Sequence, residues 1–308
     1  MTGGALLPMK TLVLAGTAEA RAVISVLASD PGFDVEASLA GATTTPAALP
    51  VPVHSGGFGG AAGLAAFCKD RQIGLILDVT HPFATVISGN AAAAAQEAAI
   101  PCLHYLRPAW RPQVGDRWRD FDSWQAMADA VPAGTSLFLA GGTQSVSVFS
   151  GRDDITLVAR ALNLGDVVPS EHATFIHALP SPTVESEVEL LKQHDISLLC
   201  CKNSGGESSK AKIIAARECG IEVWMLARKP FAFAAPSEGD ETEKTHPQQT
   251  SQKEMPMPAI HDSVEGIIDA ARKCAAVSGA AAAKSSGAAS IREKGAYNDR
   301  EPTFRDSN

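Results

Sequence analysis

The sequence predicts an α/β protein with mainly parallel sheets, and two observations support this prediction. Short, continuously apolar runs, such as the one over Gly74–Val79, alternate with segments of helical spacing along most of the chain. Apolar runs without polar alternation are typical of parallel strands that helices cover on both faces. The alternation runs to about residue 120 and then restarts, and the 308 residues suit about two domains. We therefore predict two α/β halves with a boundary near residues 120–135.

The first half begins with an apolar strand that ends in the turn Gly16-Thr17, after which apolar residues recur at helical spacing. A glycine-rich segment precedes the second helix, and the third helix is rich in alanine. The predicted strands are Lys10–Ala15, Phe33–Leu39, Val51–His54, Gly74–Val79 and Pro101–Leu106, and the predicted helices are Glu19–Ser29, Ala61–Arg71 and Ile87–Ala99.

The second half repeats this pattern after Pro132-Ala133-Gly134 breaks a short helix. Its first strand ends in Gly141-Gly142-Thr143, and a later buried strand leads into Lys202–Gly206. The predicted strands are Ser136–Ala140, Thr156–Ala159, Thr174–Ala178, Ile196–Cys201 and Glu222–Leu226, and the predicted helices are Ser123–Ala130, Val184–His194 and Ser209–Cys219.

Composition sets the expected limits of the domains. Residues 236–258 are polar and contain prolines, which is typical of a disordered insertion. Asp262-Ser263 can cap a last helix over Val264–Cys274, and the rest is rich in alanine, serine and glycine. We expect an N-terminal extension (1–8), an N-terminal domain (9–131), a C-terminal domain (132–275) and a flexible tail (276–308).

Charge and cysteine content exclude several classes of protein. A net charge of −8 and a pI near 5.5 argue against a nucleic-acid-binding protein with a broad basic face. The six cysteines form no C-x-x-C pair, so no metal site is predicted. Neither a secretory signal nor an apolar run of about 18 residues is present, so we expect a cytoplasmic protein outside the membrane. The sequence leaves the oligomeric state open.

Ligands of parallel α/β sheets gather beyond the carboxyl ends of the strands, where two glycine-containing segments lie. Gly16, Thr17, Glu19 and Arg21 follow the first strand, and a helix start there can bind a phosphate. The alternative is an ordinary turn with an acid in the first helical turn. Four glycines surround Phe58, which permits a close backbone approach by a ligand; a flexible loop is the alternative. The cofactor candidates in this second segment are Gly56, Gly57 and Gly59.

The strand over Gly74–Val79 ends with three polar side chains, Asp78, Thr80 and His81. His81 can titrate near neutral pH and is a candidate proton donor, with Asp78 and Thr80 as candidate orienting groups. The alternative is a local network in which Asp78 and Thr80 satisfy backbone groups.

Two cationic segments follow later strands. Arg107 and Arg111 flank Trp110, and this combination can clamp a carboxylate and stack on a flat ring. Solvated arginines in a proline-rich loop are the alternative. The second segment combines glycines, cations and a helix start, which makes it a candidate anion site. The alternative is a solvated, lysine-rich helix face. The candidate residues are Lys202, Asn203, Ser204, Gly205, Gly206 and Lys212.

Taken in order, these segments resemble the precorrin-6A reductase family of cobalamin biosynthesis. The resemblance runs from about Lys10 to Lys229. One departure is Arg228-Lys229, where the family pattern leads us to expect Arg-Pro. The motifs that carry the resemblance are LVLAGTAEAR (Leu12–Arg21), SGGFGG (Ser55–Gly60), DVTHPFA (Asp78–Ala84), RPAW with GDRW (Arg107–Trp118) and KNSGG with AK (Lys202–Lys212).

The resemblance implies two Rossmann-like domains facing a central cleft and an oxidoreductase that acts on CH–CH groups. NADPH would deliver a hydride to the precorrin-6A macrocycle, giving precorrin-6B. The substrate carries many carboxylates, so an acidic protein needs locally placed cations, and Arg160 joins the candidates above. Alternatives are a cobalt-precorrin-6A reductase that uses NADH, a noncatalytic two-domain binder of a carboxylated or phosphorylated molecule, and a dehydrogenase with an unrelated substrate.

Overall fold

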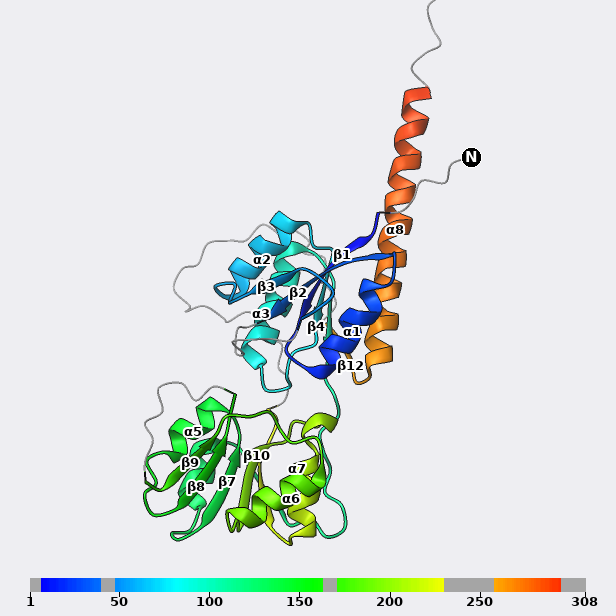
Figure 1. Ribbon diagram of the computed structural model, residues 1–308. Coiled ribbons are helices and arrows are strands. Elements are labelled where there is room, and N and C mark those ends of the chain that lie inside the picture. The colour runs from blue at the N-terminus through cyan, green and yellow to red at the C-terminus, as the bar shows by residue number, and fades with distance from the viewer. Residues whose placement is uncertain (1–6, 40–47, 163–170, 230–257, 295–308) are drawn as a thin grey trace, which may run out of the picture.

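The computed structural model describes residues 7–39, 48–162, 171–229 and 258–294, with side chains as far as Ala280. These residues form two units, each a six-stranded parallel sheet between helices (Figure 1). The predicted fold class, two Rossmann-like α/β domains, is confirmed. No helix in the described part of the chain combines the length and apolarity that a membrane span requires.

The first sheet has the strand order β3-β2-β1-β4-β5-β12. This order, with its reversal between β1 and β4, is the arrangement of dinucleotide-binding α/β folds. Its elements are β1 (Met9–Leu14), α1 (Ala18–Ala28), β2 (Phe33–Leu39), β3 (Val53–Ser55), α2 (Gly60–Arg71), β4 (Leu75–Asp78), α3 (Thr85–Ala98), β5 (Cys102–Tyr105), β12 (Ala259–His261) and α8 (Val264–Lys294).

The second sheet repeats the arrangement as β9-β8-β7-β10-β11-β6, reversing between β7 and β10. Its elements are β6 (Trp118–Phe121), α4 (Trp124–Ala130), β7 (Ser136–Ala140), α5 (Thr143–Phe149), β8 (Thr156–Arg160), β9 (Ala173–Ile176), α6 (Val184–Gln193), β10 (Leu198–Lys202), the 3-10 turn η1 (Glu207–Ser209), α7 (Ala211–Glu218) and β11 (Glu222–Leu226).

Each sheet has a hydrophobic core on both faces, which explains the unbroken apolar strands. In β1, Val13 packs under α1 and α8, whereas Leu12 and Leu14 pack under α2 and α3. In β7, Leu137 faces α4 and α5, while Phe138 faces α6 and α7. Successive side chains of a strand point to opposite faces, so a strand covered on both faces must be apolar at every position.

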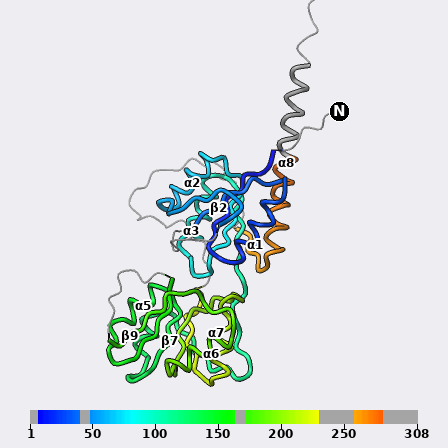
Figure 2. Tube along the Cα trace, in the orientation of Figure 1, coloured from blue at the N-terminus to red at the C-terminus, as the bar shows by residue number. Residues whose placement is uncertain are grey.

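The chain crosses between the two units twice, after β5 and after β11, so that the blue N-terminal segment and the orange α8 lie in the same unit (Figure 2). It leaves the first sheet after β5, builds the second sheet from β6 to β11, and returns with β12 and α8, where α8 packs against α1. The boundary expected at 131/132 is therefore corrected: β6 and α4 belong to the second unit, and residues 258–275 to the first. Strand pairing, which is a long-range property, decides this assignment.

Two strands and one α-helix of the described residues were not predicted, each because its local signal is weak. β6 and β12 are short edge strands, and β6 exposes the charged Arg119 and Asp120. α5 is rich in serine, threonine and valine, which are mediocre helix formers. The expected flexible tail over 276–308 is corrected as far as Lys294, because α8 continues to that residue. The expected insertion lies outside the described residues except for Pro258, as do residues 1–6 of the expected extension.

Candidate functional site

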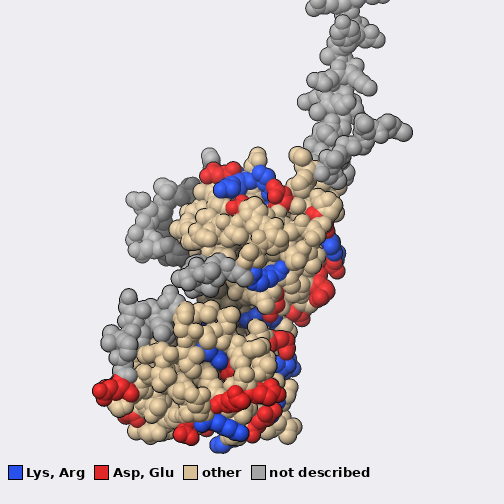
Figure 3. Space-filling model, viewed as in Figure 1, with Lys and Arg blue, Asp and Glu red and all other residues tan. Residues whose placement is uncertain are grey.

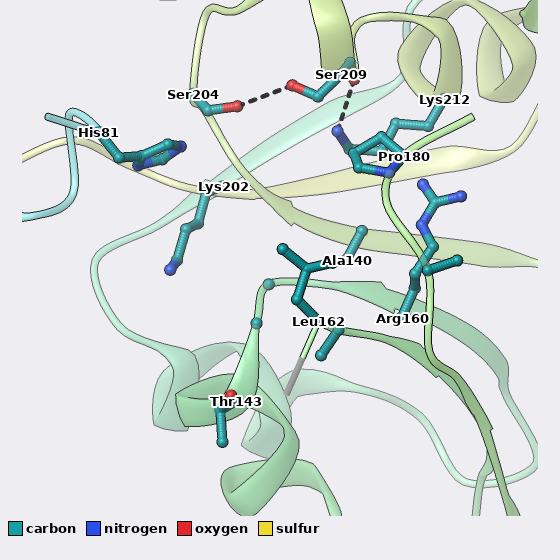
Figure 4. Close-up of a pocket in the computed structure, with 14 residues that line it drawn as sticks. His81, Ala140, Thr143, Arg160, Leu162, Pro180, Lys202, Ser204, Ser209 and Lys212 are labelled. Atoms are coloured by element: carbon teal, nitrogen blue, oxygen red, sulfur yellow. Dashed lines mark hydrogen bonds between the residues drawn. The ribbon is translucent and has the colours of Figure 1, made fainter. Parts of the chain in front are cut away.

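A pocket of 520 Å³ lies at the carboxyl end of the second sheet, and His81 of the first unit is among the residues that line it (Figure 4). His81, which follows β4, is its lining residue from the first unit. The carboxyl ends of β7, β8 and β10 and the segments that follow β7, β8, β9 and β10 supply the rest. The volume falls within the range of roughly 300–1,000 Å³ that is common for small-molecule sites. The lining from the second unit comprises Ala140, Gly141, Gly142, Thr143, Arg160, Ala161, Leu162, Ala178, Pro180, Lys202, Ser204, Ser209 and Lys212.

Three of the predicted substrate-binding cations line this pocket. Lys212 is 4% exposed, and its Nζ donates to the carbonyl oxygen of Ser209 at 2.6 Å. Lys202 lies over the ring of Phe83 at 5.6 Å, and burial lowers the pKa of both lysines. Within the described ranges, neither lysine forms an ion pair, whereas Arg160 binds Glu187 at 2.9 Å. The pocket therefore holds two positive charges without a paired carboxylate, which favours an anionic ligand.

His81 is held at the pocket by its own turn. Its Nδ1 accepts a hydrogen bond from the backbone N–H of Phe83 at 3.3 Å, so the neutral ring carries its proton on Nε2. Burial, followed by the positive charges of Arg107, Lys202, Arg228 and Lys212, lowers the pKa of His81 to about 3. The site thus holds a neutral imidazole, which can donate a hydrogen bond but is a weak acid.

The side chains of Asp78 and Thr80 form hydrogen bonds with each other, with Ser88 and with His104, and none to the His81 ring is found among the described residues, contrary to the expectation that they orient it. Asp78 accepts from the Thr80 hydroxyl at 2.6 Å and from His104 Nδ1 at 2.8 Å. Burial alone would raise the pKa of Asp78, but hydrogen bonds from His104, Ser88 and Thr80 lower it overall. Because Asp78 and His104 are paired in the β4–β5 register, their side chains lie on one face of the sheet. The local network is the interpretation that fits.

Arg107 and Glu19 bind each other rather than standing open for ligands. The Arg107 Nη1 atom donates to both Glu19 carboxylate oxygens at 2.8 Å, and its Nε donates to the carbonyl oxygen of Ser204 at 2.7 Å. Glu19 belongs to the first unit and Ser204 to the second, so Arg107 bridges the two units. The expectation of a free substrate cation at Arg107 and a cofactor ligand at Glu19 is corrected accordingly.

The glycines of the KNSGG motif make room for arginines. A Cβ on Gly205 would lie 1.9 Å from the carbonyl oxygen of Pro108 and 2.5 Å from Nη2 of Arg228. A Cβ on Gly206 would lie 2.9 Å from the guanidinium of Arg107. Gly205 and Gly206 were predicted as part of a substrate-binding anion site. In the structure, their close approach is to Pro108, Arg107 and Arg228 at the connections between the units.

Trp110 and Arg111 line a second pocket of 450 Å³ together with Gly205. Asn203 holds Trp110 in place, because its Oδ1 accepts from the backbone N–H of Trp110 at 2.8 Å and its Nδ2 donates to the Trp110 carbonyl at 3.1 Å. The predicted substrate residues are therefore distributed over two pockets, with Lys212 lying over the Trp110 ring at 5.0 Å.

The predicted cofactor residues lie in the first unit, outside both pockets. Gly16 has a φ of +129°, and nothing lies within 4 Å of a Cβ built there. Thr17 caps α1 by accepting from the N–H of Ala20, and its hydroxyl donates to the Val79 carbonyl at 2.9 Å. Arg21 is exposed on α1, and Nη1 donates to the Ala48 carbonyl at 3.4 Å.

The GGFGG loop is anchored by its aromatic residue. Phe58 stacks on His54 with ring centroids 4.6 Å apart and packs against the core under α2 and α3. A Cβ on Gly63 would lie 1.8 Å from the Phe58 carbonyl oxygen, so this helical glycine is a steric requirement. Around Gly56, Gly57 and Gly59, no atom lies within 4 Å of an added Cβ.

Sequence reasoning missed several residues of the site. Gly141, Gly142 and Thr143 line the main pocket, and a usable signal existed, because they follow β7 as Gly16 and Thr17 follow β1. Glu187 is fully buried and pairs with Arg160, but a glutamate on an amphipathic helix carries no local sign of this. Arg228 was noted only for the residue that follows it.

Charged side chains of both signs lie on the visible surface of both units (Figure 3). On the face in Figure 3, basic and acidic side chains are scattered over both units, and no continuous basic area covers that face. In the described part of the chain, no cluster of three or more His, Cys, Asp or Glu side chains is arranged to hold a metal ion.

Comparisons with known proteins agree with the motifs. The family model described as precorrin-6x reductase CbiJ/CobK matches residues 10–252. The precorrin-6A reductase of Rhodococcus erythropolis is 40% identical over 233 residues, covering 75% of this chain and 94% of the relative. The cobalt-precorrin-6A reductase of Priestia megaterium is 30% identical over 239 residues, covering 72% and 91%.

A solved structure titled CobK precorrin-6A reductase has a TM-score of 0.73 and 32% identity, covering 86% of this chain and 97% of that one. The family suggested by the ordered motifs is thereby confirmed. The chain belongs to the precorrin-6x reductase (CbiJ/CobK) family of cobalamin biosynthesis.

Proposed function

We propose that this protein reduces precorrin-6A to precorrin-6B by NADPH-dependent hydride transfer. The relatives named precorrin-6A reductase reach 40% identity, against 30% for the cobalt-precorrin-6A reductase, which supports the metal-free substrate. The pocket at the carboxyl end of the second sheet is the proposed reaction site.

The observation that carries the proposal is the pair of pocket lysines, Lys202 and Lys212, neither of which forms an ion pair with a carboxylate in the described part of the chain. Burying an ammonium group without a paired carboxylate destabilises the free protein, so a bound partner must offset this cost. The carboxylates of a tetrapyrrole supply that partner. Because the chain has a net charge of −8, its overall field repels such a substrate, and the local cations must hold it.

The first unit fits a dinucleotide at the β1–β4 reversal of its sheet. Gly16 leaves open space beside the start of α1, where backbone N–H groups suit a pyrophosphate. We assign Gly16 and Thr17 to the pyrophosphate side and Arg21 to the 2′-phosphate, which favours NADPH over NADH, and we keep the Gly56–Gly59 loop as a further contact. The reduced nicotinamide supplies the hydride when it is bound.

His81 is the proposed proton donor, and the substrate must activate it. Burial and four cations hold the imidazole neutral. Substrate carboxylates that bind Lys202 and Lys212 would compensate two of those charges, which raises the pKa of His81. The proton is then available only when the macrocycle is bound. Asp78 and Thr80 have no direct part in this step.

Oxidation of NADPH that depends on precorrin-6A tests the function, followed by the loss of absorbance of the reduced nicotinamide. We expect turnover with precorrin-6A, and a higher KM in Lys202→Ala. Binding of the macrocycle without oxidation would replace the proposal with a noncatalytic binder. Oxidation with simple carbonyl compounds alone would indicate an unrelated dehydrogenase, and a preference for NADH with the cobalt-containing substrate would move the chain to the other branch of the family.

A further inference from the structure

We propose that Arg228 is a positioning residue of this site: its guanidinium ties the two connections between the units to the loop that follows β10, and so holds the wall that carries Lys202 and Ser204. The inference deepens the proposed function and rests on it for its kinetic consequences. Its structural consequences can be measured without substrate.

The contacts of Arg228 join three segments. Its Nε donates to the carbonyl of Asn203 at 2.8 Å, and Nη2 donates to that of Ser204 at 2.8 Å. Nη1 donates to the carbonyl of Arg107 at 2.6 Å, and Nη2 also reaches that of Pro108 at 3.3 Å. Arg228 lies two residues after the end of β11, where the chain leaves the second unit, whereas Arg107 and Pro108 lie on the first crossing. One side chain therefore fastens both crossings to the β10 loop.

The chemistry of these contacts requires a guanidinium. Four carbonyl oxygens lie around a planar fork whose five N–H donors have fixed directions. A lysine ammonium offers three donors on a flexible stem and cannot reach the same four oxygens. The neighbouring Gly205 is shaped for this fork, since a Cβ there would lie 2.5 Å from Nη2 of Arg228.

The held loop carries functional side chains on both sides. Lys202 and Ser204 line the main pocket, while Asn203 clasps the backbone of Trp110 beside the second pocket. Arg107, whose carbonyl Arg228 binds, links Glu19 of the first unit to Ser204 of the second. The Arg228 contacts therefore set the distance between the first unit, which carries His81, and the wall that carries Lys202.

Arg228 also acts on His81 through its charge. It is one of four cations, with Arg107, Lys202 and Lys212, that face the imidazole and lower its pKa. Position and charge can be separated by two variants. Arg228→Lys keeps the charge and loses the fork, whereas Arg228→Gln loses both. Arg71→Gln is the matched control, because Arg71 is an exposed arginine on α2 that lines neither of the two pockets.

The experiment measures three quantities in the full chain: the indole N–H resonance of Trp110, the pKa of His81 by NMR, and kcat and KM with NADPH and precorrin-6A. We expect both Arg228 variants to shift the Trp110 resonance and to lower kcat/KM roughly 10- to 100-fold, since misplacing a binding group by about 1 Å can cost that much. The pKa of His81 should rise in Arg228→Gln and stay unchanged in Arg228→Lys. The control should change none of these.

The positioning role would be overturned if an Arg228→Lys variant that unfolds cooperatively kept the Trp110 resonance and the kcat/KM of the unsubstituted protein. If Arg228→Lys kept the activity and Arg228→Gln lost it, Arg228 would act through its positive charge alone, and the positioning role would be refuted. If the unsubstituted protein oxidises no NADPH with precorrin-6A, the proposed function fails, yet the Trp110 and His81 measurements still decide the role of Arg228.

Discussion

Replacement of Gly205 by alanine should destabilise the second unit more than the same change at Gly220. Both glycines are left-handed, with φ of +72° and +68°. That conformation costs an L-residue roughly 1–2 kcal/mol. Nothing lies within 4 Å of a Cβ on Gly220, so Gly220→Ala should cost only this amount. At Gly205 the new atom would lie 1.9 Å from the Pro108 carbonyl, and overpacking adds about 1–3 kcal/mol.

We therefore expect about 2–5 kcal/mol for Gly205→Ala. Urea unfolding followed by tryptophan fluorescence is a suitable assay, because all four tryptophans lie between residues 110 and 224 and report on the second unit and the segment leading into it. Gly205→Ala should also lower kcat/KM, whereas Gly220→Ala should not. Equal losses of stability in the two variants would refute the reasoning that close packing against the Pro108–Arg228 contact requires the KNSGG glycine.

Three further predictions concern buried polar groups. Lys212→Met should raise the free energy of unfolding by about 1–3 kcal/mol, because it removes a buried ammonium group that has no ion-pair partner among the described residues. Binding of the macrocycle should weaken in the same variant. A variant that is less stable in urea unfolding would contradict this prediction. His81 has a pKa of about 3 when folded and 6.5 ordinarily, so between these values only the unfolded chain binds the proton. Stability should thus fall as the pH drops from 6.5 toward 3, and less steeply in His81→Gln; identical slopes of the urea midpoint against pH would exclude the effect. Asp78→Asn should lower the free energy of unfolding by about 1.5–3 kcal/mol, because it weakens the hydrogen bond to His104. The NMR titration of His81 should stay unchanged in this variant; a shifted titration would show that Asp78 orients the His81 ring.

The fold was largely predictable because its signals are local. The apolar runs of β1, β4, β7 and β10, together with the glycine turns after β1, β7 and β10, indicate parallel strands. The elements that escaped prediction, β6, β12 and α5, have weak propensity or few residues. Their positions are determined by the neighbours they pair or pack with, which lie far away in the sequence.

The candidate site was predictable only in part. Lys202, Lys212, Arg160 and His81 were named from the sequence, and the structure places them around one pocket. A residue type indicates what a side chain can bind, but not what it does bind. For this reason Arg107 was interpreted as an open cation, although its charge is directed at Glu19.

The sequence alone determined the family, the two α/β halves and the residue types that serve an anionic substrate, because ordered motifs and apolar periodicity are properties of the chain itself. Only the tertiary structure decided which polar and charged side chains pair with one another. Asp78 pairs with His104 and Glu19 with Arg107, and Gly205 and Gly206 leave space for the guanidinium groups of Arg228 and Arg107. The physical reason is that hydrogen bonds and ion pairs depend on distances of a few ångströms between residues that can lie more than a hundred positions apart in the sequence. Strand register and the two crossings between the units set these distances.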